Sequence, residues 1–296
     1  MLPIKIGFLV SYDYRLLKYS LPPVYDEADK IVLAIDKKRL TWAGNKFSIE
    51  PSFFEWVKSI DTKKKIEIYE DVFYRKGLSA IECETQERNM LAQYMGEGGW
   101  HLQIDSDEYF VSFSDFVHFL RKIEKGNRPI DVQVQWVVIF KKTSSGYLIV
   151  KNGGGYISLA TTSPEYIIAR RVQKMKQYFY HQRILHDSCA RDEHEMITKL
   201  KNWGHNSDFD TDGYFHYWKN INEKNYMFAR NIHPINPEYW QGLNHIEGTN
   251  IEDLLEHAKK YSALLMSSKP LRKIDKYVTL FTPPIVTRLL LKLRNN

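Results

Sequence analysis

Apolar runs and amphipathic segments alternate over the first 110 residues of the chain. Near-continuous apolar runs and one alternating segment predict strands at residues 4–10, 30–35, 65–69 and 100–104. Helices are expected from Pro51, a residue that suits a first helical turn, and over residues 78–95, which glycines follow. This order of strands and helices predicts a mostly parallel sheet with helices on both of its faces.

The pattern changes after this part of the chain, where short alternating segments and turn residues become frequent. A helix is expected at residues 114–123, and antiparallel strands are expected at residues 132–140, 147–150, 156–160 and 166–169. The end of the chain is expected to be mainly helical. We therefore expect one α/β domain over residues 1–230, with halves at 1–110 and 111–230, and a helical extension at 231–296.

Polar side chains follow several of the expected strands, at the edge where ligands bind in such sheets. They are Ser11, Asp36, Asp71 and Asp105. The last one opens the segment 105–108, which places three carboxylates within four residues after an apolar strand. Like charges this close repel, and burial worsens the repulsion, so the cluster needs a cation. Mg²⁺ or Mn²⁺ would suit these oxygen ligands and a leaving diphosphate, whereas a solvated acidic turn is the simpler alternative.

Composition places the chain among globular proteins with anionic partners. The chain has 296 residues, of which 43% are hydrophobic and 26% charged. It can therefore bury a core, and wholesale disorder is not expected. The net charge of +6 favours nucleotide diphosphates, acidic lipids or nucleic acid. The basic residues form no stripe typical of a nucleic-acid groove, so no nucleic-acid partner is expected. Cys83 and Cys189 are far apart, which fits free thiols and a cytoplasmic protein.

The segment Glu87-Arg88-Asn89, followed about ten residues later by residues 100–108, resembles a stretch of family-2-like glycosyltransferases with the GT-A fold. That stretch has the pattern RN…A…DW…DxDE, and the resemblance covers residues 4–110 well and the remainder loosely. It implies a Rossmann-like α/β fold and a nucleotide-diphosphate-sugar donor. It also implies a divalent metal, Mn²⁺ or Mg²⁺, held by Asp107 and Asp105. His101 departs from the pattern, which has an acid or a tryptophan at that position.

The same resemblance implies donor-side residues in the first half. Asp36 matches the acid that binds the nucleoside, and Arg88 and Asn89 match helix positions that face the donor. Together with the strand-end residues above, they make up the expected donor-binding set. The spacing of Arg88 along its helix points it towards the sheet, although a salt-bridging arginine at the surface is the alternative.

A late histidine often completes the metal shell of GT-A enzymes, and a later acid acts as base on the acceptor hydroxyl. By this resemblance His186 is the expected third metal ligand and Asp187 the expected base, with His205 and Asp208 as alternatives for the two roles. A base must lie within hydrogen-bond reach of the attacking hydroxyl. Trp203 and His205 are expected on the acceptor side. A structural or surface role is the competing explanation for each histidine and acid.

Apolar residues interleave with cations over residues 271–296 at the end of the chain. Such a basic amphipathic segment suits contact with anionic lipid, and docking on the protein's own core is an equal alternative. A lipid-linked acceptor, as in polysaccharide assembly, would make peripheral contact with the inner face of a membrane useful.

These observations predict a metal-dependent glycosyltransferase, inverting as family-2 enzymes usually are, that acts on a glycan or lipid-linked hydroxyl. A metal-dependent nucleotidyltransferase or phosphohydrolase is one alternative. A nucleotidyltransferase should carry a glycine-rich phosphate loop after the first strand, and residues 10–13 contain no glycine. A non-catalytic carbohydrate-binding protein is the other alternative, which the aromatic residues permit, but it leaves the acidic segment without a purpose.

Overall fold

The computed structural model describes residues 1–124, 126–151, 154–173 and 175–260. The basic tail at residues 271–296, expected to touch lipid or the core, lies outside the described residues. Within the described part of the chain, no helix is both long and apolar enough to cross a membrane.

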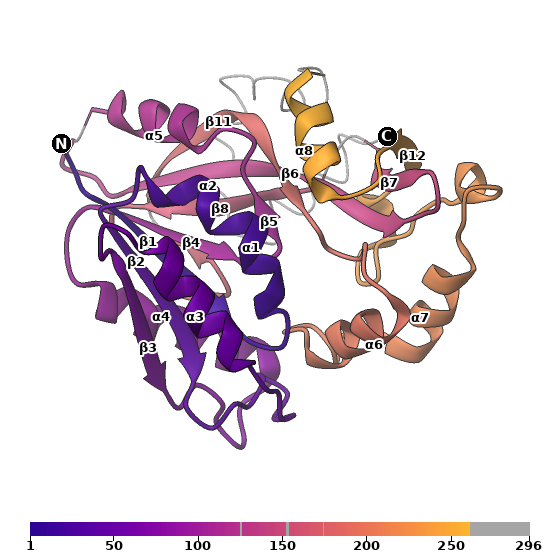
Figure 1. Ribbon diagram of the computed structural model, residues 1–296, viewed down its shortest axis with the longest axis horizontal. Helices are drawn as coiled ribbons and strands as arrows, with labels where there is room; N and C mark the ends of the chain where they lie inside the picture. Colours follow the sequence, from indigo (N-terminus) through magenta and orange to yellow (C-terminus); the bar gives the residue numbers. More distant parts are fainter. Residues whose placement is uncertain (125, 152–153, 174, 261–296) are drawn as a thin grey trace.

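Four parallel strands form the first half of a large sheet, coloured indigo to purple in Figure 1. They are β1 (Ile4–Val10), β2 (Lys30–Asp36), β3 (Ile66–Asp71) and β4 (Trp100–Asp105). Their order in the sheet is β3-β2-β1-β4, so the direction of strand succession reverses between β1 and β4. Ligands bind beyond the carboxyl ends of strands at such a reversal. Each strand expected in this half is present.

Helices cover both faces of the parallel strands. They are α1 (Leu17–Ser20), α2 (Pro22–Tyr25), α3 (Pro51–Ile60), α4 (Ala80–Met95) and α5 (Phe113–Arg121). On one face, Leu9 and Val32 pack against Leu91 of α4. Gly7 allows this close approach, because a Cβ there would lie 2.6 Å from Leu91. On the other face, residues such as Phe8 pack in the core that α3 and α5 share.

The second half of the sheet is mainly antiparallel and continues from β4. It contains β5 (Glu108–Tyr109), β6 (Ile130–Lys142), β7 (Gly146–Val150), β8 (Tyr156–Thr161), β11 (Lys176–His186) and β12 (Leu243–Glu247). From β4 the order runs β8-β6-β7-β12 with antiparallel pairing throughout, while β11 pairs with β5 and β6. The parallel half with its helices on both faces, joined to the antiparallel half, confirms the expected Rossmann-like α/β fold.

Three features of this half differ from what the sequence predicts. β11, for which the pattern predicts no strand, runs parallel to β6. Lys176 and His181 are exposed, whereas Tyr180 and residues 183–185 are buried, so its sequence lacks one clear alternation. The expected strand at 166–169 belongs to a separate two-stranded sheet of β9 (Tyr166–Ile168) and β10 (Arg171–Val172). β12 lies within the expected helical extension, yet it continues the main sheet. The division into domains stays a prediction.

The later helices lie on opposite faces of β6 and β7 (Figure 1). They are α6 (Glu193–Asn202), α7 (Thr211–Asn220) and α8 (Ile251–Lys260). Elsewhere in the chain, short 3-10 helices lie at Tyr14–Leu16, Tyr226–Phe228 and Pro237–Tyr239. Side chains of α6 and α7 pack with Val138 and Phe140, and those of α8 pack with Val137 and Ile139. Alternate residues of one strand thus serve two cores.

Two side chains fix the start of helix α6. Asp192 caps it: its carboxylate accepts from the Glu195 N–H at 2.7 Å, and the Glu195 side chain accepts from the Asp192 N–H at 3.3 Å. This reciprocal capping satisfies two N–H groups that have no helical partner. It sets the start of the helix that carries Lys199 towards the acidic segment.

Candidate functional site

A cleft of about 1350 Å³ opens beyond the carboxyl ends of β1 and β4. Residues 11–13 and 105–107, which follow these strands, form part of its lining. Other lining residues lie within the segments 168–173, 196–203 and 233–240. The lining therefore joins the parallel strand ends to the β9–β10 hairpin, to α6 and to the loop before β12.

Asp105, the first acid after β4, lies between two arginines. Arg88 Nη2 donates to Asp105 Oδ1 at 2.9 Å, and Arg170 Nη2 lies 3.5 Å from Asp105 Oδ2. Burial opposes the charged form of Asp105, but Arg88 and Arg170 hold its pKa below its usual range. Arg88 also pairs with Glu84 at 2.8 Å, one helical turn earlier. Asp105 keeps 30% of its side chain exposed, towards the cleft.

Asn89 does not line the cleft and instead anchors the hairpin that carries Arg170. Its amide nitrogen donates to the Tyr166 carbonyl at 2.8 Å, and its oxygen accepts from the Tyr166 N–H at 2.9 Å. The Thr85 hydroxyl accepts from the Ala169 N–H at 2.8 Å. Ala169 has a φ of 46°, in the left-handed region. These contacts fix the turn that places Arg170 in the lining of the cleft.

Glu108, the third acid of the segment, is fully buried and paired with Arg170. Arg170 contacts both carboxylate oxygens, at 2.7 Å from Nη1 to Oε2 and 2.5 Å from Nη2 to Oε1. Trp136 Nε1 donates to Glu108 Oε1 at 2.9 Å. Bidentate pairs of this kind are among the strongest polar contacts in proteins. Arg170 therefore links the buried Glu108 to the more exposed Asp105.

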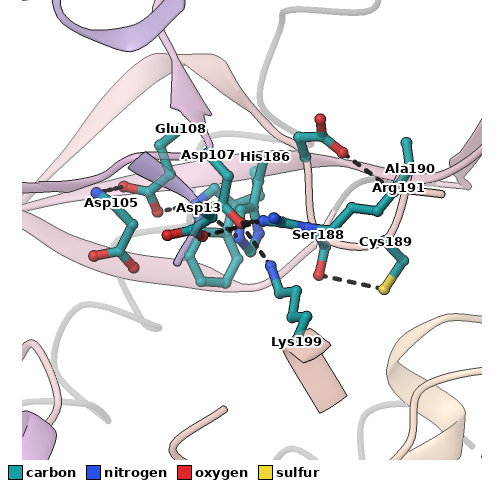
Figure 2. Close-up of polar contacts among 12 residues, drawn as sticks. Asp13, Asp105, Asp107, Glu108, His186, Ser188, Cys189, Ala190, Arg191 and Lys199 are labelled. Carbon is teal, nitrogen blue, oxygen red and sulfur yellow. Dashed lines mark hydrogen bonds and ion pairs between the residues drawn. The ribbon is translucent and has the colours of Figure 1, made fainter. Parts of the chain in front are cut away.

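Asp107 is held by two cations from a later part of the chain (Figure 2). Its Oδ2 accepts from Lys199 Nζ at 2.6 Å and from Arg191 Nη2 at 2.7 Å. Burial opposes the charged carboxylate, but Lys199, then His186 in its protonated form and Arg191, outweigh this penalty, so the pKa of Asp107 lies well below its ordinary value. Arg191 Nη2 also lies 3.4 Å from Asp13 Oδ2, and Asp13 follows β1.

Strand β11 brings His186 next to the acidic segment. β5 pairs antiparallel with β11, with His186 opposite Glu108. His186 Nε2 lies 3.6 Å from Asp107 Oδ1, and the imidazole packs against Trp136 with ring centroids 4.4 Å apart. Burial lowers the pKa of His186 to about 4, so the ring is neutral near pH 7. His186 therefore adds no charge to balance Asp107.

The two candidate bases occupy different places. Asp187 is buried and does not line the cleft. Its carboxylate accepts from the Ala190 N–H at 3.1 Å, and burial raises the pKa of Asp187 to about 6. Asp208 lines the cleft, and its Oδ2 lies 2.6 Å from His205 Nδ1. Trp203 also lines the cleft, with its ring centroid 5.2 Å from that of His205. The structure thus groups three of the expected acceptor-side residues and separates Asp187 from them.

Asp36, the acid expected to bind the nucleoside, is occupied by backbone N–H groups. Its Oδ1 accepts from Lys38 at 2.8 Å and Leu40 at 3.1 Å, and its Oδ2 accepts from Phe73 at 2.8 Å and Tyr74 at 3.2 Å. A carboxylate offers about four lone-pair sites, so these bonds use nearly all of its capacity. Asp36 lines the cleft, but its carboxylate ties together the loops that follow β2 and β3.

The other donor-side residues are divided between the cleft and its surroundings. Ser11 lines the cleft, whereas Asp71 does not and accepts from the Val72 N–H at 2.7 Å. Near Asp36, Trp42 and Glu87 line the cleft, and Trp42 Nε1 donates to Glu87 Oε2 at 2.6 Å. Burial raises the pKa of Glu87 to about 8, so this carboxyl is mostly protonated near pH 7.

The acidic segment does not fit a resident metal ion as its side chains lie. Asp107 Oδ2 already accepts from two cationic groups, and Asp105 Oδ1 accepts from a third. Within the described ranges, no three His, Cys, Asp or Glu side chains converge in a way that could hold a metal. An ion there would have to displace protein cations. Mn²⁺ or Mg²⁺ at Asp105, Asp107 and His186 stays a prediction from the sequence.

The acids of the site and Arg88, which pairs with Asp105, are visible in the sequence, but the other cations that neutralise these acids are not. Arg170, Arg191 and Lys199 lie 62, 84 and 92 positions from the acids they contact. Lys199 lies in the last turn of α6, where a positive charge is favourable in any helix, so its position along the chain does not reveal its partner. One signal was available, because three clustered carboxylates require cationic partners of some kind.

Fold and site together define a Rossmann-like α/β protein with a charged ligand cleft at the switch point of its sheet. No protein-family profile and no curated protein sequence matches this chain. Among solved structures, a crystal structure of S. aureus TarS (1-349) is similar over 49% of this chain, at 13% sequence identity and a TM-score of 0.30. The match covers 41% of that chain, and a likeness this distant assigns no activity.

Proposed function

We propose that this protein is a glycosyltransferase that moves a sugar from a nucleotide-diphosphate donor to a hydroxyl of a glycan or lipid-linked acceptor. One observation carries the proposal: the cleft beyond β1 and β4 combines cationic side chains with aromatic and hydrogen-bonding groups. Cationic groups suit a diphosphate, and aromatic faces suit sugar rings and nucleobases. The resemblance of residues 87–108 to family-2-like enzymes supports the same reaction.

On the donor side, Arg88, Arg170 and Lys199 supply the positive charge for the diphosphate, since all three line the cleft. Trp42 offers an aromatic face for the nucleobase. Asp36 acts by holding the loops after β2 and β3 in shape, because its oxygens are used by backbone N–H groups. The nucleoside would thus lie near β2 and the diphosphate near β4.

In the proposed reaction, the acceptor hydroxyl oxygen attacks the anomeric carbon of the donor sugar. The new C–O bond forms as the bond from that carbon to the diphosphate breaks, and the diphosphate leaves with the electron pair. The hydroxyl proton passes to a base on the protein. Asp208, held by His205, is the base candidate that lines the cleft. Inversion at the anomeric carbon is the outcome that the family resemblance favours.

A thermal-shift panel tests the function. UDP-, GDP-, dTDP- and CMP-sugars are added to the full chain, each with Mn²⁺ and with EDTA. One class of diphosphate donor should raise the melting temperature, and the CMP-sugars, which lack a diphosphate, should not. Stabilisation by none of these donors under either condition would overturn the proposal.

Turnover of the stabilising donor then tests the base. Asp208→Asn should lose sugar transfer while it keeps the donor-induced shift, since a base acts on the acceptor. Asp212→Asn, an exposed position on α7 that does not line the cleft, is the matched control. Loss of transfer in Asp187→Asn alone would assign the role to Asp187 instead.

A further inference from the structure

The two cations on Asp107 differ in what they can reach. Arg191 keeps 4% of its side chain exposed, is not among the cleft-lining residues, and contacts Asp13 as well as Asp107. Lys199 donates to the same Asp107 oxygen, but it lines the cleft and keeps 14% of its side chain exposed. Asp107 is therefore neutralised from the protein interior by Arg191, and Lys199 is a second cation on one carboxylate oxygen.

From this difference we propose that Lys199 acts in place of a divalent metal ion on the diphosphate of the donor, with Asp107 as its docking carboxylate. The proposal rests on the proposed function and names the cation that this site uses. As a nucleoside diphosphate group enters, Lys199 Nζ moves from Asp107 to a phosphate oxygen, and Arg191 continues to neutralise Asp107. When the sugar is transferred, the electron pair left on the diphosphate meets this ammonium group.

The chemistry of the side chain suits this exchange. A lysine ammonium is a compact charge with three donors on a flexible stem, so it can turn between two nearby acceptors and bind phosphate as a point charge. Its backbone is held in α6, whose start the Asp192–Glu195 capping pair fixes. Figure 2 shows the Lys199 side chain extending from this helix to Asp107, so a small rotation of the stem moves the charge without moving the helix.

The need for positive charge near the carboxylates, which is the reason to expect a metal ion, is also satisfied by protein side chains. Repulsion among three clustered carboxylates calls for a cation, and each of the three has a cationic partner within 2.9 Å. A divalent ion bound by Asp105 and Asp107 would lie among four protein cations and would be repelled by them. A diphosphate, by contrast, is attracted by the cations among these that line the cleft, Arg88, Arg170 and Lys199, once Lys199 turns away from Asp107.

Calorimetric titration of the unaltered full chain decides between the two cations. UDP, GDP, CDP and dTDP are titrated in excess EDTA and again with Mn²⁺. We expect one of them to bind in EDTA with an affinity that Mn²⁺ does not improve. Binding that needs Mn²⁺ would overturn the inference and leave the proposed function in place. No binding under either condition would overturn the function and the inference with it.

Substitutions on α6 identify the residue responsible. Lys199→Met should weaken binding in EDTA about 10- to 100-fold, the range for a lost hydrogen bond to a charged group. Lys201→Met is the matched control, because Lys201 is exposed on the same helix and does not line the cleft; its affinity should be unchanged. Equal affinities for the Lys199→Met and unaltered proteins would overturn the assignment.

Asp107→Asn separates a docking carboxylate from a metal ligand. With the charge on this side chain removed, Lys199 is freer to meet a phosphate, so binding in EDTA should be retained or strengthened. A metal ligand in this position predicts the opposite, a loss of nucleotide binding with Mn²⁺ present. Should this variant fail to fold, as seen in its circular dichroism, the comparison of EDTA with Mn²⁺ on the unaltered chain still gives the answer.

Discussion

Asp36 at the end of β2 and the acids at the end of β4 look alike in sequence but are held in different ways. Each follows a buried strand of the parallel sheet. Asp36 accepts four N–H groups from loops next to it in the sheet. Asp107 and Glu108 are instead held by arginine and lysine side chains from the far half of the chain.

The difference teaches how two similar motifs serve different purposes. A carboxylate saturated by backbone N–H groups shapes the loops around it and has little capacity left for a ligand. A carboxylate held by a flexible cationic side chain can release that cation to an incoming anion. Because of this contrast, we propose that the diphosphate binds at the end of β4 and that Asp36 holds the loops after β2 and β3 in shape. Four substitutions test it.

The largest effect is expected when the cation on Glu108 is removed. Arg170→Met leaves the fully buried Glu108 without its bidentate partner, which should lower the free energy of unfolding by about 3–5 kcal/mol. Urea denaturation measures this loss. Arg171→Met, at the exposed neighbouring residue, is the control and should change stability by less than about 0.5 kcal/mol. If Arg170→Met lowers the free energy of unfolding as little as the control does, charge pairing does not stabilise the region at the end of β4.

A pH-dependent effect is expected near Asp36, where Glu87 has Trp42 as a partner. Burial raises the Glu87 pKa to about 8, so the folded protein keeps a proton that the unfolded chain releases above about pH 4.5. Unaltered protein should therefore lose on the order of 3 kcal/mol of stability relative to Glu87→Gln as pH rises from about 5 to 8. Asp107, with its lowered pKa, behaves in the opposite sense and loses its contribution only in acid. Unfolding measured across this range should give diverging profiles, and parallel ones would contradict the buried, protonated state.

A smaller loss is expected for Asp36→Asn. The amide keeps the shape but replaces one accepting oxygen with a donor, so two backbone N–H groups lose their acceptor, and stability should fall by about 1–3 kcal/mol. Nucleotide binding, measured by the thermal shift, should persist. Unchanged stability together with lost nucleotide binding would show that Asp36 contacts the nucleoside directly, as the family resemblance implies.

The smallest effect is expected at an exposed ion pair beside Asp36. Arg39 Nη2 lies 2.6 Å from Glu70 Oε1, with side chains 30% and 41% exposed. Solvent screens such pairs, so Arg39→Met should change the unfolding free energy by no more than about 1 kcal/mol in a urea titration. A loss as large as that of Arg170→Met would mean that exposure does not separate the two kinds of ion pair.

The parallel half of the fold could be predicted because β1, β2 and β4 are buried on both faces and leave apolar runs in the sequence, while the edge strand β3 leaves an alternating one. Strand β11 could not, since its register with β6 and β5 is a long-range contact and its burial changes along its length. Among the site residues, Asp105 and Asp107 could be predicted from the sequence, because the end of a buried strand is visible in the residues next to it. Asn89 was selected because it matches a donor-facing position of the family pattern. In the structure its side chain bonds to the backbone of Tyr166 instead.

Local periodicity and strand-end position were enough to establish the α/β class and the edge of the sheet where a ligand would bind. The partners of each charged side chain there depended on folding, because Arg170, Arg191 and Lys199 approach the acidic segment only after the hairpin, β11 and α6 have packed against it. A carboxylate in a sequence carries a charge that needs balancing. Whether backbone N–H groups, protein cations or a metal ion supply the balance is decided by which groups the tertiary structure brings within a few ångströms.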